Sequence, residues 1–270
     1  MKWEIIKQFS AENKRFFSYG DVIAEYPDKD RSYLSKVLAE MVRAGMLMKL
    51  HRNVYHIIPL SANPHTYSPD SPLLAKSIMN GKEYYIAYSS ALHIHRLMDQ
   101  PESKMMIATN RQIQPSIKTI AGKEVQFIYH TFGRFFGYGE MWVSTQEQVM
   151  VSDLEKTIVD AVSKPQLCGG IIAVGKAIYN SNERTELEKM FYYLSRNRSH
   201  AAKKRYLYLS DFLGMEWTSE HERMLKECGS SISLLDPSGL AQGSKNSRFG
   251  LKINIELNPL KDSMTQLWCP

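Results

Sequence analysis

Apolar residues recur at helical spacing three times in the first 45 positions of the chain. They predict a helix around residues 5–9, a second over residues 18–26 that Pro27 terminates, and a third that opens at residues 28–30. Gly45 follows the last apolar residue of the third stretch, where a left-handed residue commonly ends a helix. The opening of the chain is therefore predicted to form three short helices.

Two β-prone runs follow these helices, at residues 46–50 and 54–58. A polar segment, residues 51–53, joins them, and the pattern predicts a β-hairpin. Three helices followed by a hairpin is the order of a winged helix-turn-helix, whose third helix enters the major groove of DNA. The hairpin then lies along the backbone or minor groove. We therefore expect residues 1–60 to be a DNA-binding domain.

The composition changes character at Pro59. Four prolines fall between Pro59 and Pro72, and because proline lacks a backbone donor and restricts the residue before it, residues 61–82 are expected to form a connector. Beyond it, residues 83–270 are expected to form a mixed α/β domain. Strands are predicted at residues 84–86, 105–108, 124–130, 140–143, 149–151 and 248–255, and helices at 89–97, 153–162 and onward to about 213. The expected fold class is α+β.

The overall composition is that of an ordinary globular protein, since 43% of the 270 residues are hydrophobic and 23% are charged. Charges interrupt the apolar N-terminal stretch and no 18-residue uncharged apolar run occurs, so neither a signal peptide nor a membrane helix is expected. Cys168, Cys228 and Cys269 lie far apart, which argues against a disulfide framework and a zinc ribbon. We expect a cytoplasmic protein with reduced thiols and no membrane contact.

Basic residues are concentrated in the third predicted helix and the hairpin. Between Lys29 and Arg52, six basic residues stand against two acidic ones, in a chain with a formal net charge of +6. Such a balance favours a polyanionic partner. The residues expected to contact DNA are Arg31, Ser32, Tyr33, Ser35 and Lys36 on the helix and Lys49, His51, Arg52 and Asn53 on the hairpin. The alternative is a small domain that contacts proteins and whose charges are solvated.

A second basic cluster occurs in the C-terminal half of the chain. It has five cations and no acid, namely Arg196, Arg198, Lys203, Lys204 and Arg205. The cluster is predicted either to extend a nucleic-acid footprint or to lie at a helix–helix junction with each cation solvated. The sequence does not choose between these two interpretations.

Enzyme motifs are poorly represented in the sequence. His93 and His95 are two residues apart, a spacing that does not place both on one helix face. The segment 153–156 combines two carboxylates with a lysine, so the best enzyme hypothesis is a metal-dependent nuclease that uses Asp153 or Asp160. That segment opens a predicted helix, however, and Asp153 is better interpreted as its N-cap. We therefore expect no catalysis, no cofactor and no bound metal.

Several segments, in their order along the chain, resemble one known family. The strongest match reads Ser-Asp-Leu-Glu-Lys-Thr-Ile-Val-Asp at residues 152–160. The other matching segments are 17–22, 35–47, 53–55, 88–92, 165 with 168–170, and 248–254. With these features the chain resembles the AbiEi-type antitoxins, transcriptional regulators of bacterial type IV toxin–antitoxin (abortive infection) systems.

The resemblance implies that a winged helix represses the protein's own operon by binding double-stranded DNA at its promoter, with inverted repeats expected by analogy. It also implies that the C-terminal body neutralises a co-encoded nucleotidyltransferase-like toxin without forming a stable complex. The alternative from another class is an interaction protein that does not bind DNA and uses the winged helix and the body to hold a protein partner.

Overall fold

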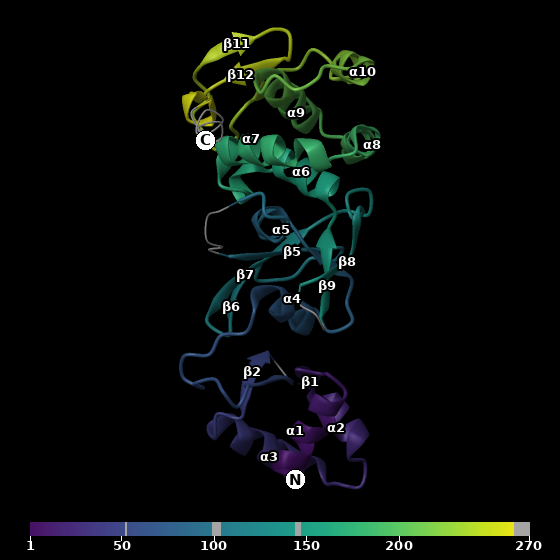
Figure 1. Ribbon diagram of the computed structural model, residues 1–270, viewed down its shortest axis with the longest axis vertical. Coiled ribbons are helices and arrows are strands. Elements are labelled where there is room, and N and C mark those ends of the chain that lie inside the picture. Colours follow the sequence, from purple (N-terminus) through teal and green to yellow (C-terminus); the bar gives the residue numbers. More distant parts are fainter. Residues whose placement is uncertain (52, 99–103, 144–146, 262–270) are drawn as a thin grey trace.

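The computed structural model describes residues 1–51, 53–98, 104–143 and 147–261. Three parts follow one another along its long axis: an N-terminal unit of helices with a small sheet, a six-stranded sheet with helices against it, and a C-terminal helical part with a second small sheet (Figure 1). We call residues 1–58 the N-terminal unit and residues 71–261 the body. Helices and strands occur in each part, so the fold is mixed α+β.

The N-terminal unit has three helices and a hairpin at the predicted positions. Its elements are α1 (Lys2–Ala11), β1 (Phe16–Ser18), α2 (Tyr19–Glu25), α3 (Arg31–Arg43), β2 (Leu47–His51) and β3 (Val54–Ile57). Strand β1 is not predicted from the sequence, because three residues are too few to show an alternation. It pairs antiparallel with β3, Phe17 opposite Tyr55, and gives a sheet of order β1-β3-β2.

Short polar side chains set the starts of α2 and α3. Ser18 and Asp21 form a capping box, in which each side chain accepts a hydrogen bond from the backbone N–H of the other. Asp30 accepts a backbone N–H at the start of α3. Gly45 ends α3 with a φ of +69°, and a Cβ there would lie 2.8 Å from Pro64. The expectation of a left-handed glycine at the end of the third helix is therefore confirmed.

A mixed sheet of order β6-β7-β5-β4-β9-β8 forms the centre of the body. Its strands are β4 (Tyr84–Ile86), β5 (Met105–Thr109), β6 (Ile117–Ile120), β7 (Lys123–Tyr129), β8 (Tyr138–Trp142) and β9 (Gln148–Ser152). Five of these six lie at predicted positions. Strand β6 is missed because it is an edge strand with a polar centre, Lys118 and Thr119, so no apolar run marks it.

The segment expected to be a connector contains a helix, α4 (Ser71–Met79). Leu73, Leu74 and Met79 of α4 are buried in one cluster with residues of the central sheet. The prediction of a connector over residues 61–82 is therefore wrong for this stretch. Pro72 lies in the first turn of the helix, where its missing N–H costs no intrahelical bond.

Helices and a small sheet complete the body. The helices are α5 (Tyr88–Ile94), α6 (Leu154–Ser163), α7 (Gly170–Ser181), α8 (Leu187–Asn197), α9 (His200–Phe212) and α10 (Ser219–Glu227), and the strands are β10 (Ser233–Leu234), β11 (Ser244–Asn246) and β12 (Leu251–Ile253). Strand β12 confirms a late strand, shorter than predicted. Across the described residues, no helix is both long and apolar enough to cross a bilayer.

Candidate nucleic-acid interface

Helix α3 has one buried and one exposed face. Its apolar stripe, Leu34, Val37, Leu38 and Met41, is buried in the core of the N-terminal unit. The helix residues predicted to contact DNA all lie on the exposed face, namely Arg31, Ser32, Tyr33, Ser35 and Lys36. Figure 1 shows α1, α2 and α3 at the end of the unit that is farthest from the body. The structure thus brings these five side chains together on a surface that the body does not cover.

Asp30 caps the first turn of α3. The Asp30 carboxylate accepts hydrogen bonds from the backbone N–H of Tyr33, at 2.9 Å, and from the hydroxyl of Ser32, at 2.6 Å. These bonds, the Ser32 hydroxyl first, lower the pKa of Asp30. The Tyr19 hydroxyl donates to the backbone oxygen of Arg31 at 2.6 Å and ties α2 to α3. Because the Ser32 hydroxyl already donates to the capping carboxylate of Asp30, it is a weaker candidate for base contact than its neighbours.

A cationic cleft of about 350 Å³ adjoins the C-terminal end of α3. Arg43, Lys49 and His65 contribute the basic side chains, and no acidic residue is among the described residues that line it. Lys49 extends from β2, so helix and hairpin both contribute. Sequence reasoning predicted Lys49 but missed Arg43 and His65, because neither lies in the first half of the helix or in the hairpin.

The hairpin is docked on the body. Leu50 and Val54 are buried in the same cluster as Leu73 of α4, and Figure 1 shows the hairpin pointing toward the body. Asn53 has a φ of +62°, which asparagine tolerates without glycine, and its carbonyl accepts the N–H of Tyr19 at 2.7 Å. Leu50 and Val54 therefore pack between the two units, whereas Leu47 and Tyr55 of the hairpin are buried in the core of the N-terminal unit.

Two of the predicted hairpin contacts cannot be placed as side chains. Arg52 lies outside the described residues, and of His51 the structure describes only its position at the end of β2. Of the four hairpin residues predicted to contact DNA, the structure therefore places the side chains of Lys49 and Asn53, and both are exposed.

The second basic cluster is not a surface patch. Lys203, Lys204 and Arg205 lie in α9 and are buried, with exposed fractions of 7%, 1% and 5%. Lys204 donates to the backbone oxygen of Ser231, and Lys203 pairs with Glu227 at 3.3 Å. The prediction of an extended nucleic-acid footprint is therefore wrong for these three residues. The cluster does lie at a helix–helix junction, between α8 and α9, but these three cations are not solvated.

Arg205 forms hydrogen bonds to backbone carbonyls of other segments of the body. Its guanidinium donates to the carbonyl of Val162 at 3.0 Å and to those of Leu234 and Leu235 at 3.1 and 3.0 Å. Val162 lies in the last turn of α6, where backbone carbonyls lack intrahelical partners and carry partial negative charge. A buried cation is tolerated there because it donates to this helix-terminal carbonyl and to the carbonyls of Leu234 and Leu235 at once.

The remaining two cations of that cluster are exposed. Arg196 stacks on the ring of Phe136 at 4.1 Å, and Arg198 ends α8 in a left-handed conformation. Since the other three side chains are buried, the five cations do not form one footprint.

The two carboxylates of the nuclease hypothesis have structural partners. Asp153 caps α6 by accepting the N–H of Lys156 at 2.9 Å, which confirms the N-cap interpretation. Its other oxygen accepts from the Tyr193 hydroxyl at 2.8 Å. Asp160 is 2% exposed and forms a buried ion pair with Lys156. No group of three or more metal-binding side chains occurs in the described part of the chain.

A polar network surrounds this ion pair inside the body. The hydroxyls of Tyr85 and Tyr88 each lie 2.8 Å from a ring nitrogen of His130, and the Tyr85 hydroxyl also donates to Asp160 at 3.3 Å. Burial lowers the pKa of His130 to about 4 and raises the pKa of both tyrosines. The spacing of Lys156 and Asp160, four apart on a predicted helix, is the sequence signal that would have indicated their pairing.

Comparison with known proteins adds a fold relationship. No protein-family model matches the chain, and no curated protein matches it either. Among solved structures, the chain is similar to the crystal structure of the RV2827C protein from Mycobacterium tuberculosis. The sequence identity is 13% and the TM-score is 0.73, over 97% of this chain and 93% of the other. At this identity the likeness shows a shared fold, which includes both the N-terminal unit and the body.

Proposed function

We propose that the N-terminal unit is a winged helix-turn-helix and that the protein is a sequence-specific DNA-binding transcriptional regulator. The observation that carries the proposal is the exposed face of α3, which presents Arg31 and Lys36 at the end of the molecule away from the body. The element order and the pairing of three short strands are those expected of a winged helix.

In this proposal α3 enters the major groove with its N-terminal half. Arg31 and Lys36 reach base edges, where such side chains recognise guanine, and Ser35 and Tyr33 line the same surface. The cationic cleft formed by Arg43, Lys49 and His65 holds backbone phosphates, which position the helix without reading sequence.

The regulator is further proposed to be an autorepressing antitoxin of the AbiEi type, with its own promoter as the DNA target. The resemblance of the sequence to that family supports this, and its strongest segment forms the start of the buried helix α6. The body would then neutralise a co-encoded nucleotidyltransferase-like toxin without a stable complex and without catalysis of its own.

Fluorescence anisotropy of the full chain tests the DNA-binding proposal. The probes are a duplex from upstream of the protein's own gene and a scrambled duplex of equal length, each measured across a salt series. We expect the upstream duplex to bind about 10³-fold or more tightly than the scrambled one, with affinity falling steeply as salt rises. Equal and weak binding to both would overturn the proposal. Co-purification of a stoichiometric protein partner without DNA retention would then support the interaction-protein alternative.

A further inference from the structure

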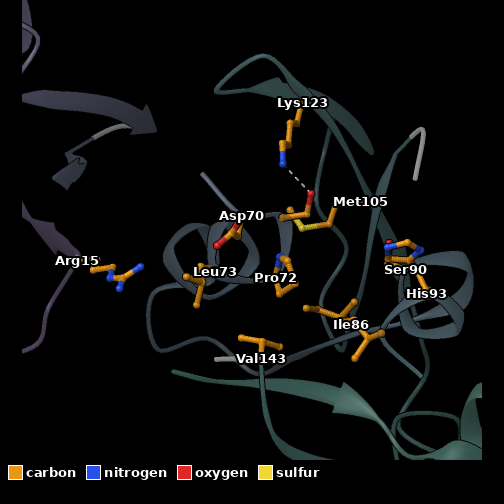
Figure 2. Close-up of a pocket in the computed structure, with 12 residues that line it drawn as sticks. Arg15, Asp70, Pro72, Leu73, Ile86, Ser90, His93, Met105, Lys123 and Val143 are labelled. Atoms are coloured by element: carbon orange, nitrogen blue, oxygen red, sulfur yellow. Dashed lines mark hydrogen bonds between the residues drawn. The ribbon is translucent and has the colours of Figure 1, made fainter. Parts of the chain in front are cut away.

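A cavity of about 460 Å³ lies where the N-terminal unit meets the body (Figure 2). Arg15, which directly precedes β1, lines it from the N-terminal unit. The body contributes the start of α4, one face of α5 and residues of the central sheet. We call this space the junction cavity. It is large enough for an organic molecule of metabolite size.

The inner wall of the junction cavity is apolar. Besides Ile94 of α5, its side chains come from α4, from the central sheet and from the segment after β8, and they are Pro72, Leu73, Ile86, Met105 and Val143. Figure 2 shows them around the start of α4, with Ile86 and Val143 below the helix and Met105 above it. A hydrocarbon or aromatic group would gain free energy by displacing water from such a wall.

The polar part of the lining contains two cations, Arg15 and Lys123, together with His93, two serines and a carboxylate. Lys123 is held in place by donating to the carbonyl of Pro69 and the hydroxyl of Ser71, both at 2.9 Å. Figure 2 shows the Arg15 side chain extending toward α4, and within the described residues its guanidinium forms no ion pair. Among the described residues that line the cavity, Asp70 is the single carboxylate, and it makes no capping hydrogen bond to α4.

We propose that the junction cavity binds a small amphipathic organic anion, with its apolar part on the inner wall and its carboxylate paired with Arg15. Lys123 adds positive potential at the same site. Asp70 repels the ligand's charge and so selects a monoanion over a polyanion such as a nucleotide.

The site goes beyond the DNA-binding proposal and does not depend on it. The carbonyl of Arg15 accepts the N–H of Ile57, so the arginine is fixed to the sheet of the N-terminal unit, whereas Lys123 belongs to the sheet of the body. A ligand held by Arg15 and the apolar wall therefore bridges the two units. Its binding can be measured without DNA.

Isothermal titration calorimetry of the full chain with 4-phenylbutyrate tests the proposal. Two comparison compounds separate the contributions: 4-phenylbutyramide keeps the apolar part without the charge, and acetate keeps the charge without the apolar part. We expect saturable binding of 4-phenylbutyrate and at least about tenfold weaker binding of each comparison compound. Equal binding of the amide, or no saturable binding of 4-phenylbutyrate up to its solubility limit, would overturn the proposal.

Two substitutions of opposite sign locate the site. Arg15→Gln should weaken 4-phenylbutyrate binding by about fivefold or more, and Asp70→Asn should strengthen it by about threefold, because each removes one charge near the ligand's carboxylate. Lys14→Gln is the matched control, since Lys14 is exposed, pairs with Glu12 and does not line the cavity. An equal effect of Lys14→Gln and Arg15→Gln, or weaker binding to Asp70→Asn, would place the anion elsewhere and refute the assignment.

Discussion

Helix α3 of the N-terminal unit and helix α9 of the body both begin in basic stretches of sequence, yet their cations have opposite environments. Arg31 and Lys36 of α3 are exposed on the face opposite its apolar stripe. Lys204 and Arg205 of α9 are buried and hydrogen-bonded to backbone carbonyls. The same residue types thus serve as a surface in one region and as interior support in the other.

The neighbouring elements explain the difference. Helix α3 lies at one end of the molecule and packs on one side only, so its polar face stays in water. Helix α9 packs against α6, α7, α8 and α10 and against β10, and these elements surround it. The buried cations of α9 are tolerated because they donate hydrogen bonds to the carbonyl of Ser231 and to a carbonyl in the last turn of α6. Local charge density therefore does not indicate a binding surface unless one face of the helix is free.

Lowering the pH should destabilise both the N-terminal unit and the body, and this is the largest change in the free energy of unfolding that we expect. Burial lowers the pKa values of His56 in the N-terminal unit and His130 in the body to about 4, from 6.5. The folded protein therefore excludes protons that the unfolded chain binds, so stability is complete above pH 6.5 and falls as the pH drops toward 4. Each histidine should contribute a loss of about 3 kcal/mol by pH 4.

Urea unfolding at several pH values between 7 and 4 measures this loss. His56→Gln should reduce the pH dependence of the free energy of unfolding by about the contribution of one histidine, roughly 3 kcal/mol by pH 4, and leave the contribution of His130. An unchanged pH dependence in His56→Gln would show that the N-terminal unit does not hold a buried neutral histidine. The N-terminal unit and the body would then differ in their sensitivity to acid as well.

Arg205→Ala tests the interior role of the α9 cations. It should lower the free energy of unfolding by about 2–4 kcal/mol, because it leaves the carbonyls of Val162, Leu234 and Leu235 without their donor. Arg196→Ala is the matched control: that side chain is exposed and stacks on Phe136, so its loss should cost below about 1 kcal/mol. Equal costs in urea unfolding would contradict the distinction between buried and exposed cations.

Arg31→Ala and Lys36→Ala test the surface role of the α3 cations. Each should lose about 1–3 kcal/mol of discrimination between the upstream and the scrambled duplex, with a free energy of unfolding within about 0.5 kcal/mol of the parent. Anisotropy titrations measure the discrimination. Arg196→Ala should bind DNA like the parent. A comparable loss in Arg196→Ala would extend the footprint to the body and break the contrast between the two helices.

Local patterns were sufficient to predict the three helices and the hairpin of the N-terminal unit. The starts of α2 and α3 depend on Ser18 and Asp30, and the end of α3 on Gly45, all of which act within a few residues of themselves. The same holds for Asp153, whose cap of α6 follows from its position before a helical pattern. These features could be predicted because the interaction that fixes each one is close in sequence.

The features that were missed depend on distant partners. Strand β1 exists through its pairing with β3, and Arg205 is buried because α9 packs against the end of α6. Leu50 contributes to packing with α4, which no pattern within the hairpin reveals. The same reason explains why Arg43 and His65 were not predicted to share a cleft with Lys49. Chain folding, not local composition, places these residues together.

Lys49→Ala should have the smallest effect. Lys49 is exposed and lines the cationic cleft with Arg43, so the proposal assigns it to a phosphate and not to a base. The substitution should weaken upstream and scrambled duplexes alike, by below about 1 kcal/mol, and reduce the slope of log affinity against log salt by about 1. Arg52→Ala is predicted from the sequence to act in the same way. If Lys49→Ala instead weakened only the upstream duplex, the hairpin would read sequence together with α3. The division between a reading helix and a positioning cleft would then be wrong.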